Sequence, residues 1–272
     1  MGRNVLVTGA SRGIGAAIAL AFAAQGDNVG INYRYNDDSA GAICGKAKVY
    51  GVKANIYQAD VGNADEVQSM FEQYFNDFKT IDILVNNAGG GLKIPEGGFE
   101  NMPLTYWDEM IALNLNAAAY CSHHAVRNMI DHKASGSIIN ISSVHSVITY
   151  VKRKTFPYCA AKAGLNMLTK TMGVDVIRHG IRVNGIAPGF ISTSATTRYN
   201  KEELHAFLRK IPAGYLGRVE DITPMVLFLA DPEKSGFIVG QTFIIDGGQS
   251  IDGTIDYMLQ EQMNKKEDNY GV

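Results

Sequence analysis

The sequence predicts a single α/β domain in which helices cover both faces of a mostly parallel sheet of seven strands. Three observations predict this class. Short runs of β-branched and apolar residues alternate with helix-length segments from the N-terminus onward, as in repeated strand–helix–strand units. The 272 residues suffice for one large domain, and no Pro-, Gly- or Ser-rich linker or internal repeat divides them. We therefore expect one doubly wound domain over residues 1–250 and a tail at 251–272.

The first half of the chain supplies four of the expected strands and three helices. The run at 4–9 is β-branched, and the Ala-rich segment 13–25 after it has helical character. A polar helix is expected up to about residue 50. The helix expected at 63–79 is amphipathic, because its large apolar side chains recur at helical spacing. The expected strands of this half are residues 4–9, 28–33, 52–60 and 81–89.

The second half continues the alternation with three strands and three helices. A long helix is expected at 105–132, and the buried strand that follows it ends in two serines. The polar excursion at 190–214, with a short helix of its own, interrupts the pattern. The expected strands of this half are residues 136–143, 181–189 and 242–246, and the remaining helices are 158–179 and 219–230.

Composition and charge argue against several classes of function. The chain carries 25 Lys and Arg against 27 Asp and Glu, a net charge of -2, which offers no basic footprint for nucleic acid. No apolar run approaches the roughly 20 residues of a membrane helix, and the N-terminus lacks the features of a secretory signal. The three cysteines are widely spaced, with no CxxC or Cys/His cluster for a metal. We expect a cytoplasmic protein without a metal site.

Glycines at positions 9, 13 and 15 lie in the turn between the first strand and the first helix. Residues without a Cβ let the backbone approach a pyrophosphate, which can rest on the positive N-terminus of the helix. Such turns also simply end strands, and the spacing G-x3-G-x-G differs from the G-x-G-x-x-G fingerprint. The position at the first strand–helix junction favours a dinucleotide-binding turn.

The tip of the second strand bears on which dinucleotide is bound. NAD-binding folds usually place an acidic residue there for the ribose 2′-hydroxyl. This chain has Tyr33 and Arg34 at the tip, with no carboxylate before Asp37, and Arg12 lies in the glycine-rich turn. Two guanidinium groups suit a 2′-phosphate, which accepts charge-assisted hydrogen bonds from arginine. The sequence therefore favours NADP(H), with NAD(H) as the alternative.

The segment FPYCAAKAG places Tyr158 and Lys162 four residues apart, on one face of an expected helix. One interpretation is a half-buried tyrosine beside a lysine whose stem covers apolar surface. The other is a proton donor whose pKa is tuned by its neighbour. The pair alone does not decide between them.

Five segments follow one another in order over residues 3–248: TGASRGIG, NNAG, the serine pair, the Tyr/Lys pair and APG. Together they resemble the short-chain dehydrogenase/reductase family, including its glucose 1-dehydrogenase and 3-oxoacyl carrier-protein reductase members. The resemblance implies a Rossmann fold and a catalytic tetrad of Asn114, Ser143, Tyr158 and Lys162. The cofactor contacts, from the resemblance and the strand tip, are Thr8, Gly9, Ser11, Arg12, Gly13, Ile14, Gly15, Tyr33, Arg34, Asp60, Val61, Asn87, Ala88, Gly89, Tyr158, Lys162, Pro188, Gly189, Ile191 and Thr193.

The resemblance also implies how the tetrad works. Tyr158 exchanges a proton with a carbonyl or alcohol oxygen while a nicotinamide supplies or accepts hydride. Lys162 and the oxidised ring would lower the pKa of the phenol, Ser143 would orient the substrate oxygen, and Asn114 would hold a water. We expect a ketone reductase using NADPH. A sugar or hydroxysteroid dehydrogenase is the alternative, and a non-catalytic NADP(H) sensor is disfavoured by the full tetrad.

Some features stay open at this stage. Ser143 and Tyr158 are fifteen residues apart where the family usually has thirteen, and Ser142 is the alternative serine. Lys152–Lys154 form either a solvated loop or a cationic rim for an anionic substrate. The excursion at 190–214 is expected to close over the substrate, whereas the tail either covers a pocket or frays. By resemblance, the helices at 105–132 and 158–179 would pair subunits in a homotetramer or homodimer.

Overall fold

The computed structural model describes residues 2–91, 95, 98–149, 155–194 and 200–251. Its centre is one seven-stranded sheet in the order β3-β2-β1-β4-β5-β6-β7, in which every neighbouring pair is parallel. The predicted doubly wound α/β fold is confirmed, and the sheet is wholly parallel. The strands are β1 (Asn4–Val7), β2 (Asn28–Tyr33), β3 (Ala54–Gln58), β4 (Ile83–Asn86), β5 (Gly136–Ile141), β6 (Ile181–Pro188) and β7 (Thr242–Ile245).

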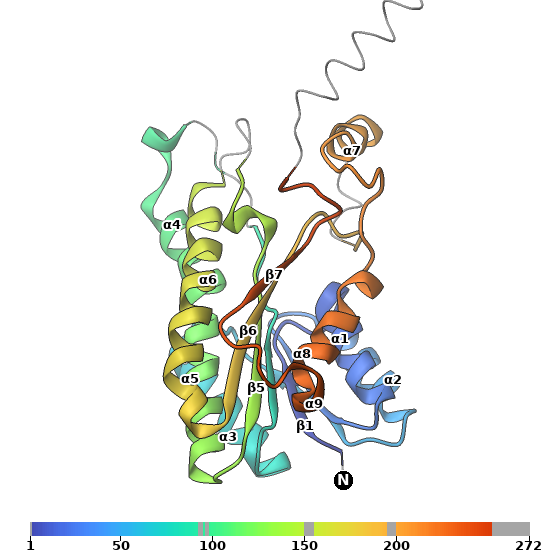
Figure 1. Ribbon diagram of the computed structural model, residues 1–272, viewed down its shortest axis with the longest axis vertical. Coiled ribbons are helices and arrows are strands. Elements are labelled where there is room, and N and C mark those ends of the chain that lie inside the picture. The colour runs from blue at the N-terminus through green and yellow to red at the C-terminus, as the bar shows by residue number, and fades with distance from the viewer. Residues whose placement is uncertain (1, 92–94, 96–97, 150–154, 195–199, 252–272) are drawn as a thin grey trace, which may run out of the picture.

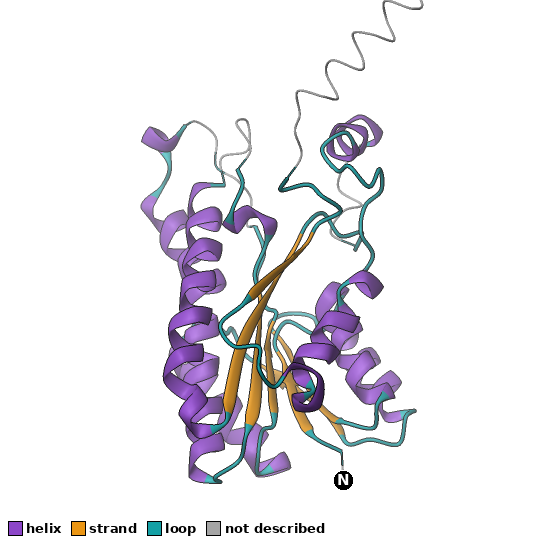
Figure 2. Ribbon diagram, viewed as in Figure 1, coloured by secondary structure: helices purple, strands orange, loops and turns teal. Residues whose placement is uncertain are grey.

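Helices cover both faces of this sheet. Figure 1 shows α1, α2 and α8 on one face, with α3, α5 and α6 on the other, and Figure 2 shows the same three layers by element type. This arrangement follows from right-handed crossovers between parallel strands, which carry each helix back across the sheet. The helices are α1 (Gly13–Ala24), α2 (Asp37–Lys48), α3 (Ala64–Phe78), α4 (Leu104–Ile111), α5 (Ala117–Asp131), α6 (Phe156–Val176), α7 (Lys201–Leu208), α8 (Thr223–Ala230) and α9 (Pro232–Ser235).

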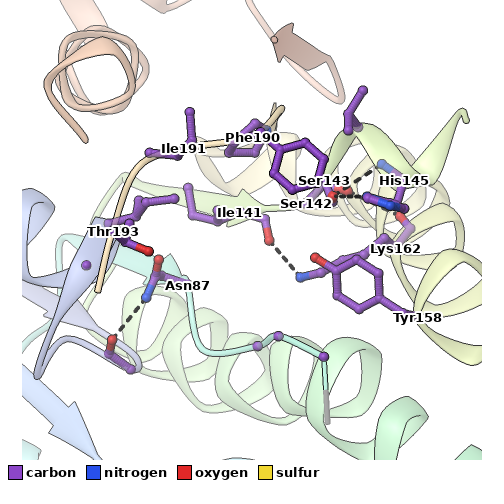
Figure 3. Close-up of a pocket in the computed structure, with 18 of the residues that line it drawn as sticks. Asn87, Ile141, Ser142, Ser143, His145, Tyr158, Lys162, Phe190, Ile191 and Thr193 are labelled. Carbon is purple, nitrogen blue, oxygen red and sulfur yellow. Dashed lines mark hydrogen bonds between the residues drawn. The ribbon is translucent and has the colours of Figure 1, made fainter. Parts of the chain in front are cut away.

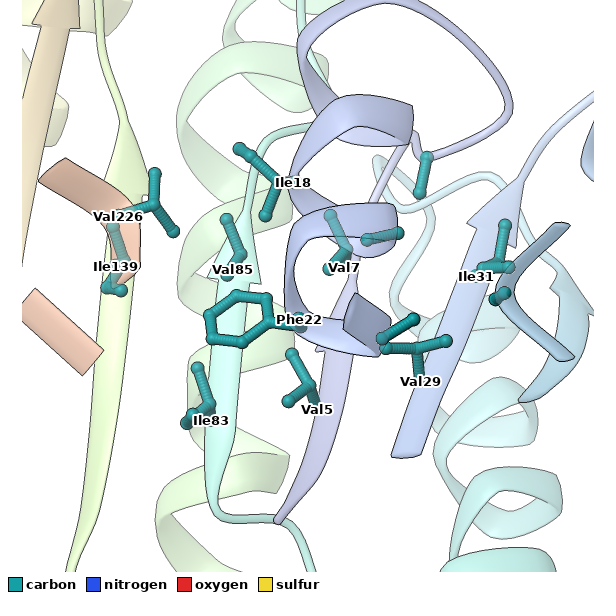
Figure 4. Close-up of a cluster of buried hydrophobic side chains, with 14 of the residues drawn as sticks. Val5, Val7, Ile18, Phe22, Val29, Ile31, Ile83, Val85, Ile139 and Val226 are labelled. Carbon is teal, nitrogen blue, oxygen red and sulfur yellow. The ribbon is translucent and has the colours of Figure 1, made fainter. Parts of the chain in front are cut away.

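The core between α1 and the sheet is built from β-branched strand residues and one large aromatic ring. Phe22 of α1 is fully buried among side chains of β1 and β4, including Val5, Val7, Ile83 and Val85 (Figure 4). Burying a side chain of this size contributes about 1.5–3 kcal/mol relative to leaving it in water. On the opposite face, the apolar stripe of α3 forms a second cluster with residues of α5, as its helical spacing predicts.

The expected helix at 105–132 is the one that differs most from a regular α-helix. It consists of α4 and α5 joined by a π turn, Ala112–Asn116. Such turns insert an extra residue and are frequent at functional sites. Asn114 lies within this turn, and its side chain is buried.

The strand order places a crevice at one end of the sheet. The chain runs from β1 outward to β2 and β3, and then crosses to β4 on the other side of β1. In sheets of this type, the connections that leave the carboxyl ends of the strands separate at this reversal and leave room for a ligand. Among the described residues, no helix combines the length and apolar character needed to cross a membrane.

Candidate active site

A cleft of about 600 Å³ opens at the carboxyl ends of the strands. The connections after β1, β4, β5 and β6 line it together with the start of α6, so segments far apart in sequence meet there. Of the predicted site residues, the lining contains Gly9, Arg12, Gly13, Ile14, Gly15, Asn87, Gly89, Ser143, Tyr158, Lys162, Pro188, Gly189, Ile191 and Thr193. The others lie outside this lining: Thr8, Ser11, Tyr33, Arg34, Asp60, Val61, Ala88 and Asn114.

The glycine-rich turn is held against the end of β4 by a set of short hydrogen bonds. Thr8 Oγ1 accepts from the backbone N–H groups of Asn87 and Ala88 at 3.0 and 2.9 Å. The Asn87 side chain donates to the carbonyl oxygens of Thr8 and Gly9. Gly9 has a φ of +61°, and a Cβ there would lie 2.9 Å from the Cα of Ala88. Thr8 and Ala88 therefore lie outside the cleft lining but hold the glycine-rich turn in place.

The N-terminus of α1 faces the cleft. The helix begins at Gly13 without a side-chain cap at Arg12 and without an acidic residue in its first turn. Its first N–H groups have no acceptor within the helix, so together with the positive end of the helix dipole they can receive an anion. A turn without Cβ atoms at Gly9 and Gly13, ending in an uncapped helix, fits the pyrophosphate of a dinucleotide.

The tip of β2 lies beside the end of β3. Arg34 Nη2 is 2.7 Å from Asp60 Oδ2, and its guanidinium carbon lies 4.5 Å from the centre of the Tyr35 ring. Tyr33 is buried, and its hydroxyl donates to Asp37 at 2.7 Å, which raises the pKa of the phenol. The two predicted adenosine-side contacts Arg34 and Asp60 are therefore paired with each other.

Ser143, Tyr158 and Lys162 meet in the cleft (Figure 3). Tyr158 and Lys162 come from the first turns of α6, and Ser143 follows β5. The Lys162 Nζ atom lies 5.8 Å from the centre of the Tyr158 ring and donates to the Ile141 carbonyl oxygen at 2.9 Å. Lys162 is 3% exposed, so its ammonium group is enclosed by protein.

Burial dominates the electrostatics of this pair. It lowers the pKa of Lys162 to about 8 because the charged ammonium loses its hydration. It also raises the pKa of Tyr158, and a hydrogen bond with Ser143 opposes that rise. Among the protein's own groups burial therefore outweighs the others, and the pKa of Tyr158 lies above its ordinary value. A lowering of that pKa by Lys162 together with an oxidised nicotinamide stays a prediction.

The two serines after β5 have different partners. Ser142 Oγ donates to Asn166 Oδ1 at 2.6 Å and lies 3.3 Å from the Lys162 carbonyl oxygen, so it joins β5 to α6. Ser143 Oγ instead accepts from the His145 backbone N–H at 3.2 Å, and Ser143 acts to lower the pKa of Tyr158. This geometry favours Ser143 as the serine that meets a substrate. The Lys152–Lys154 segment lies outside the described residues.

Asn114 lies behind the cleft in the π turn. Its Oδ1 accepts from the Gly90 N–H at 2.9 Å, and its Nδ2 donates to the carbonyl oxygens of Gly90 and Met110 at 3.1 and 3.0 Å. A Cβ on Gly89 would be 2.9 Å from Asn114 Oδ1 and 3.2 Å from Lys162 Nζ. Asn114 and Lys162 therefore approach the same glycine from two helices.

The connection after β6 completes the cleft. Thr193 reaches the glycine-rich turn, where a Cβ on Gly13 would lie 3.6 Å from its Cγ2. Phe190 lines the cleft and stacks on Phe207 of α7, with ring centres 4.4 Å apart. The sequence motifs did not single out Phe190 as part of the site. They did not single out His145 either, although it lies two residues after Ser143 in the segment SSVH.

Comparison with known proteins identifies the family. Residues 9–250 match a family model described as "Enoyl-(Acyl carrier protein) reductase". The chain belongs to the short-chain dehydrogenase/reductase family. It is 36% identical to 3beta-hydroxysteroid dehydrogenase 1 of Eggerthella lenta over 252 residues, covering 92% of this chain and 94% of that protein. It is 40% identical to a 3-oxoacyl-acyl-carrier-protein reductase of Synechocystis over 243 residues, covering 89% and 95%.

Solved structures show the same relationship. A short-chain type dehydrogenase/reductase from Mycobacterium marinum has a TM-score of 0.84 and 33% identity, covering 91% of this chain and 95% of the other. Acetoin dehydrogenase YohF from Salmonella typhimurium has a TM-score of 0.82 and 32% identity, covering 92% and 98%. The chain is therefore an oxidoreductase that acts on hydroxyl and carbonyl groups of small molecules with a nicotinamide cofactor.

Proposed function

We propose that this protein is an NADPH-preferring reductase that converts a ketone into a secondary alcohol. The observation that carries the proposal is the meeting of Ser143, Tyr158 and Lys162 in one cleft that also contains the glycine-rich turn. In such a cleft the nucleotide and the reacting oxygen would share one continuous space. A sensor that only bound the nucleotide would not need this arrangement of hydroxyl, phenol and ammonium groups.

In the proposed mechanism, Tyr158 is the acid in reduction and the base in oxidation. When bound, the nicotinamide supplies or accepts hydride. Tyr158 would give its proton to the carbonyl oxygen as negative charge develops there, against the burial that raises the pKa of the phenol. Ser143 would donate a hydrogen bond to the same oxygen and stabilise the negative charge that develops there. Lys162, with its pKa lowered to about 8, would return a proton to Tyr158.

Asn114 would support this proton path. Its amide is fixed by Gly90 and Met110 next to the Gly89 backbone, which Lys162 Nζ also approaches. A water held there would link Lys162 to solvent. The role is inferred from the family resemblance and from the proximity of both side chains to one glycine.

The proposed preference for NADPH over NADH rests on Arg12, Arg34 and the lack of an acidic residue in the chain between the end of β2 and Asp37. Arg12 lines the cleft beside the N-terminus of α1. Arg34 would exchange its ion pair with Asp60 for the 2′-phosphate, a dianion that outcompetes a single carboxylate. The other cofactor contacts named above are proposed on the same grounds, with NADH as the alternative ligand.

The substrate is proposed as a small ketone, with a sugar or a hydroxysteroid as the alternative. Support for a range of carbonyl substrates comes from relatives named for steroid, 3-oxoacyl and acetoin substrates. The segment 190–214 is proposed as a lid over this substrate; its residues 195–199 lie outside the described residues, and its described part includes Phe190 and α7. We further propose that a catalytic domain at 1–250 assembles as a homotetramer or homodimer in the cytoplasm.

The test is a substrate panel run with both cofactors. Consumption of NADPH and of NADH is followed with ethyl acetoacetate, acetoin, androstenedione and glucono-lactone, and in reverse with glucose. We expect turnover of at least one ketone, with a higher kcat/KM for NADPH. Tyr158→Phe is the matched control, since it removes one oxygen and should retain NADPH binding. Undiminished turnover in that variant would refute the mechanism.

A further inference from the structure

His145 is a cleft residue that the mechanism above does not use. It lies in the short 3-10 turn Val144–Ser146, two residues after Ser143, and its side chain lines the cleft (Figure 3). Its ring meets the Tyr158 ring edge-on, with centres 5.7 Å apart and planes at 70°. His145 thus contacts both of the groups proposed to act on the substrate oxygen.

The contact with Ser143 involves two separate groups of His145. The backbone N–H of His145 donates to Ser143 Oγ at 3.2 Å, and the ring Nδ1 lies 3.4 Å from the same oxygen. A serine hydroxyl has one hydrogen to donate and two lone pairs that accept. If Nδ1 carries its hydrogen, His145 fills both lone pairs, and the Ser143 hydrogen is free for another acceptor. If Nδ1 carries none, it attracts that hydrogen to itself.

The remaining bonds of Ser143 favour the first arrangement. Ser143 also opposes the rise in the pKa of the Tyr158 phenol, as a hydrogen directed towards the phenol oxygen would. The Ser143 carbonyl oxygen accepts from both Ser146 Oγ at 2.6 Å and Ser146 N at 2.9 Å, which fixes the turn. The backbone that carries the Ser143 hydroxyl is therefore fixed, and the His145 ring sets the direction of the hydroxyl hydrogen.

We infer that His145 is a positioning residue: its Nδ1–H and backbone N–H hold Ser143 Oγ so that the hydroxyl hydrogen points at Tyr158 and the reacting oxygen. This inference rests on the proposed roles of Ser143 and Tyr158. It assigns to His145 the orientation of a hydrogen bond that would otherwise have two possible directions. The alternative is that the ring only packs against Tyr158.

Two variants separate orientation from packing. His145→Phe keeps an aromatic ring against Tyr158 but removes the ring nitrogens, whereas His145→Asn removes the ring but offers an amide N–H close to the position of Nδ1. A residue that only packs would tolerate Phe better than Asn. A residue that orients Ser143 would tolerate Asn better than Phe. Melting temperature and NADP⁺ binding confirm that each variant is folded.

The readout is the titration of Tyr158 with NADP⁺ bound, followed by ¹³C NMR of Cζ-labelled tyrosine and assigned with Tyr158→Phe. Loss of one oriented hydrogen bond should raise the Tyr158 pKa by about 0.5–1 pH unit in His145→Phe. His145→Asn should restore most of that change. The ionisable groups Lys162 and Cys159, which also face or adjoin the phenol, are the same in all variants.

Kinetics and the tautomer give two further measurements. With ethyl acetoacetate and NADPH, kcat should fall about tenfold in His145→Phe while KM changes less than twofold. In the wild-type protein, ¹⁵N correlation spectra of the His145 ring should show a hydrogen on Nδ1. A bare Nδ1, an unmoved Tyr158 titration in His145→Phe, or equal effects of Phe and Asn would overturn the inference. Failure of the wild type to reduce any ketone would instead count against the proposed function.

Discussion

Replacing glycines one at a time by alanine tests how closely the glycine-rich turn approaches the end of β4. Gly9, Gly13 and Gly51 all have positive φ, at +61°, +59° and +79°. An added Cβ would lie 2.9 Å from the Cα of Ala88 at position 9, but no closer than 3.6 Å to any atom at position 13. At position 51 it would meet nothing within 4 Å. Of these three glycines, only Gly9 combines backbone strain with a collision.

The expected magnitudes follow from these distances. A left-handed conformation costs an alanine about 1–2 kcal/mol, partly offset by about 0.4–1 kcal/mol because alanine restricts the unfolded chain. Crowding a packed backbone adds about 1–3 kcal/mol. We therefore expect Gly9→Ala to lower the free energy of unfolding by about 2–4 kcal/mol, against about 1 kcal/mol for Gly13→Ala and Gly51→Ala. The shift would also disturb the bond from the Gly9 N–H to Asn32 Oδ1, which is 3.0 Å long.

Urea unfolding followed by circular dichroism measures these differences in stability. Titration of the same samples with NADP⁺ measures how tightly the glycine-rich turn binds the nucleotide. For a domain of this size, 3 kcal/mol corresponds to a melting-temperature change of about 6 °C. We expect NADP⁺ binding to weaken in Gly9→Ala and to be unaffected in Gly51→Ala. If Gly9→Ala is no less stable than Gly13→Ala, the close approach of the glycine-rich turn to the end of β4 described above is wrong.

Three other changes test the site. Ser143→Ala should lower kcat about 100-fold through loss of a donor to the reacting oxygen. Ser142→Ala should lower the free energy of unfolding by about 1–2 kcal/mol and reduce kcat less. Equal effects on kcat would contradict the assignment of Ser143 as the serine that meets the substrate. Lys162 has a pKa of about 8 in the folded chain and 10.5 as its ordinary value, so between those pH values only the unfolded chain holds the proton. The contribution of Lys162 to the free energy of unfolding therefore rises with pH across that window, by up to ~3 kcal/mol. In urea unfolding, the stability of the wild type relative to Lys162→Met should be higher at pH 10 than at pH 7.5. The same difference at both pH values would refute the lowered pKa of Lys162. Arg34→Gln should weaken NADP⁺ binding about 10–100-fold and NAD⁺ binding little by calorimetry, with the exposed Arg178→Gln as control; equal losses for both nucleotides would remove the 2′-phosphate role.

Local spacing predicted the parts of the site that lie within one turn of chain. The glycine-rich turn leads into α1, and the Tyr158/Lys162 pair lies within α6. The geometry of each is therefore set by a single helix. The alternation of strands and helices likewise predicted the fold, since a strand–helix–strand unit has one common hand.

Contacts between distant segments could not be predicted in the same way. The Arg34–Asp60 ion pair depends on the register of β2 against β3, which no local pattern encodes. The raised pKa of Tyr158 depends on burial by segments from several connections, whereas the sequence showed only the lysine four residues away. The segment SSVH contained the signal for His145, but its meaning required the position of Tyr158.

The π turn that contains Asn114 has a consequence for how this region can change in evolution. The helical run must present Tyr106 and Met110 to the cleft at one end and Cys121 and Ala125 to the core at the other. Each residue of an α-helix advances the chain by about 100°. Deleting one residue at the wide turn would make the helix regular, but it would rotate one of these two faces by that angle. The extra residue thus sets the angle between the face that lines the cleft and the face that packs in the core. This run should therefore tolerate substitutions far better than changes in its length.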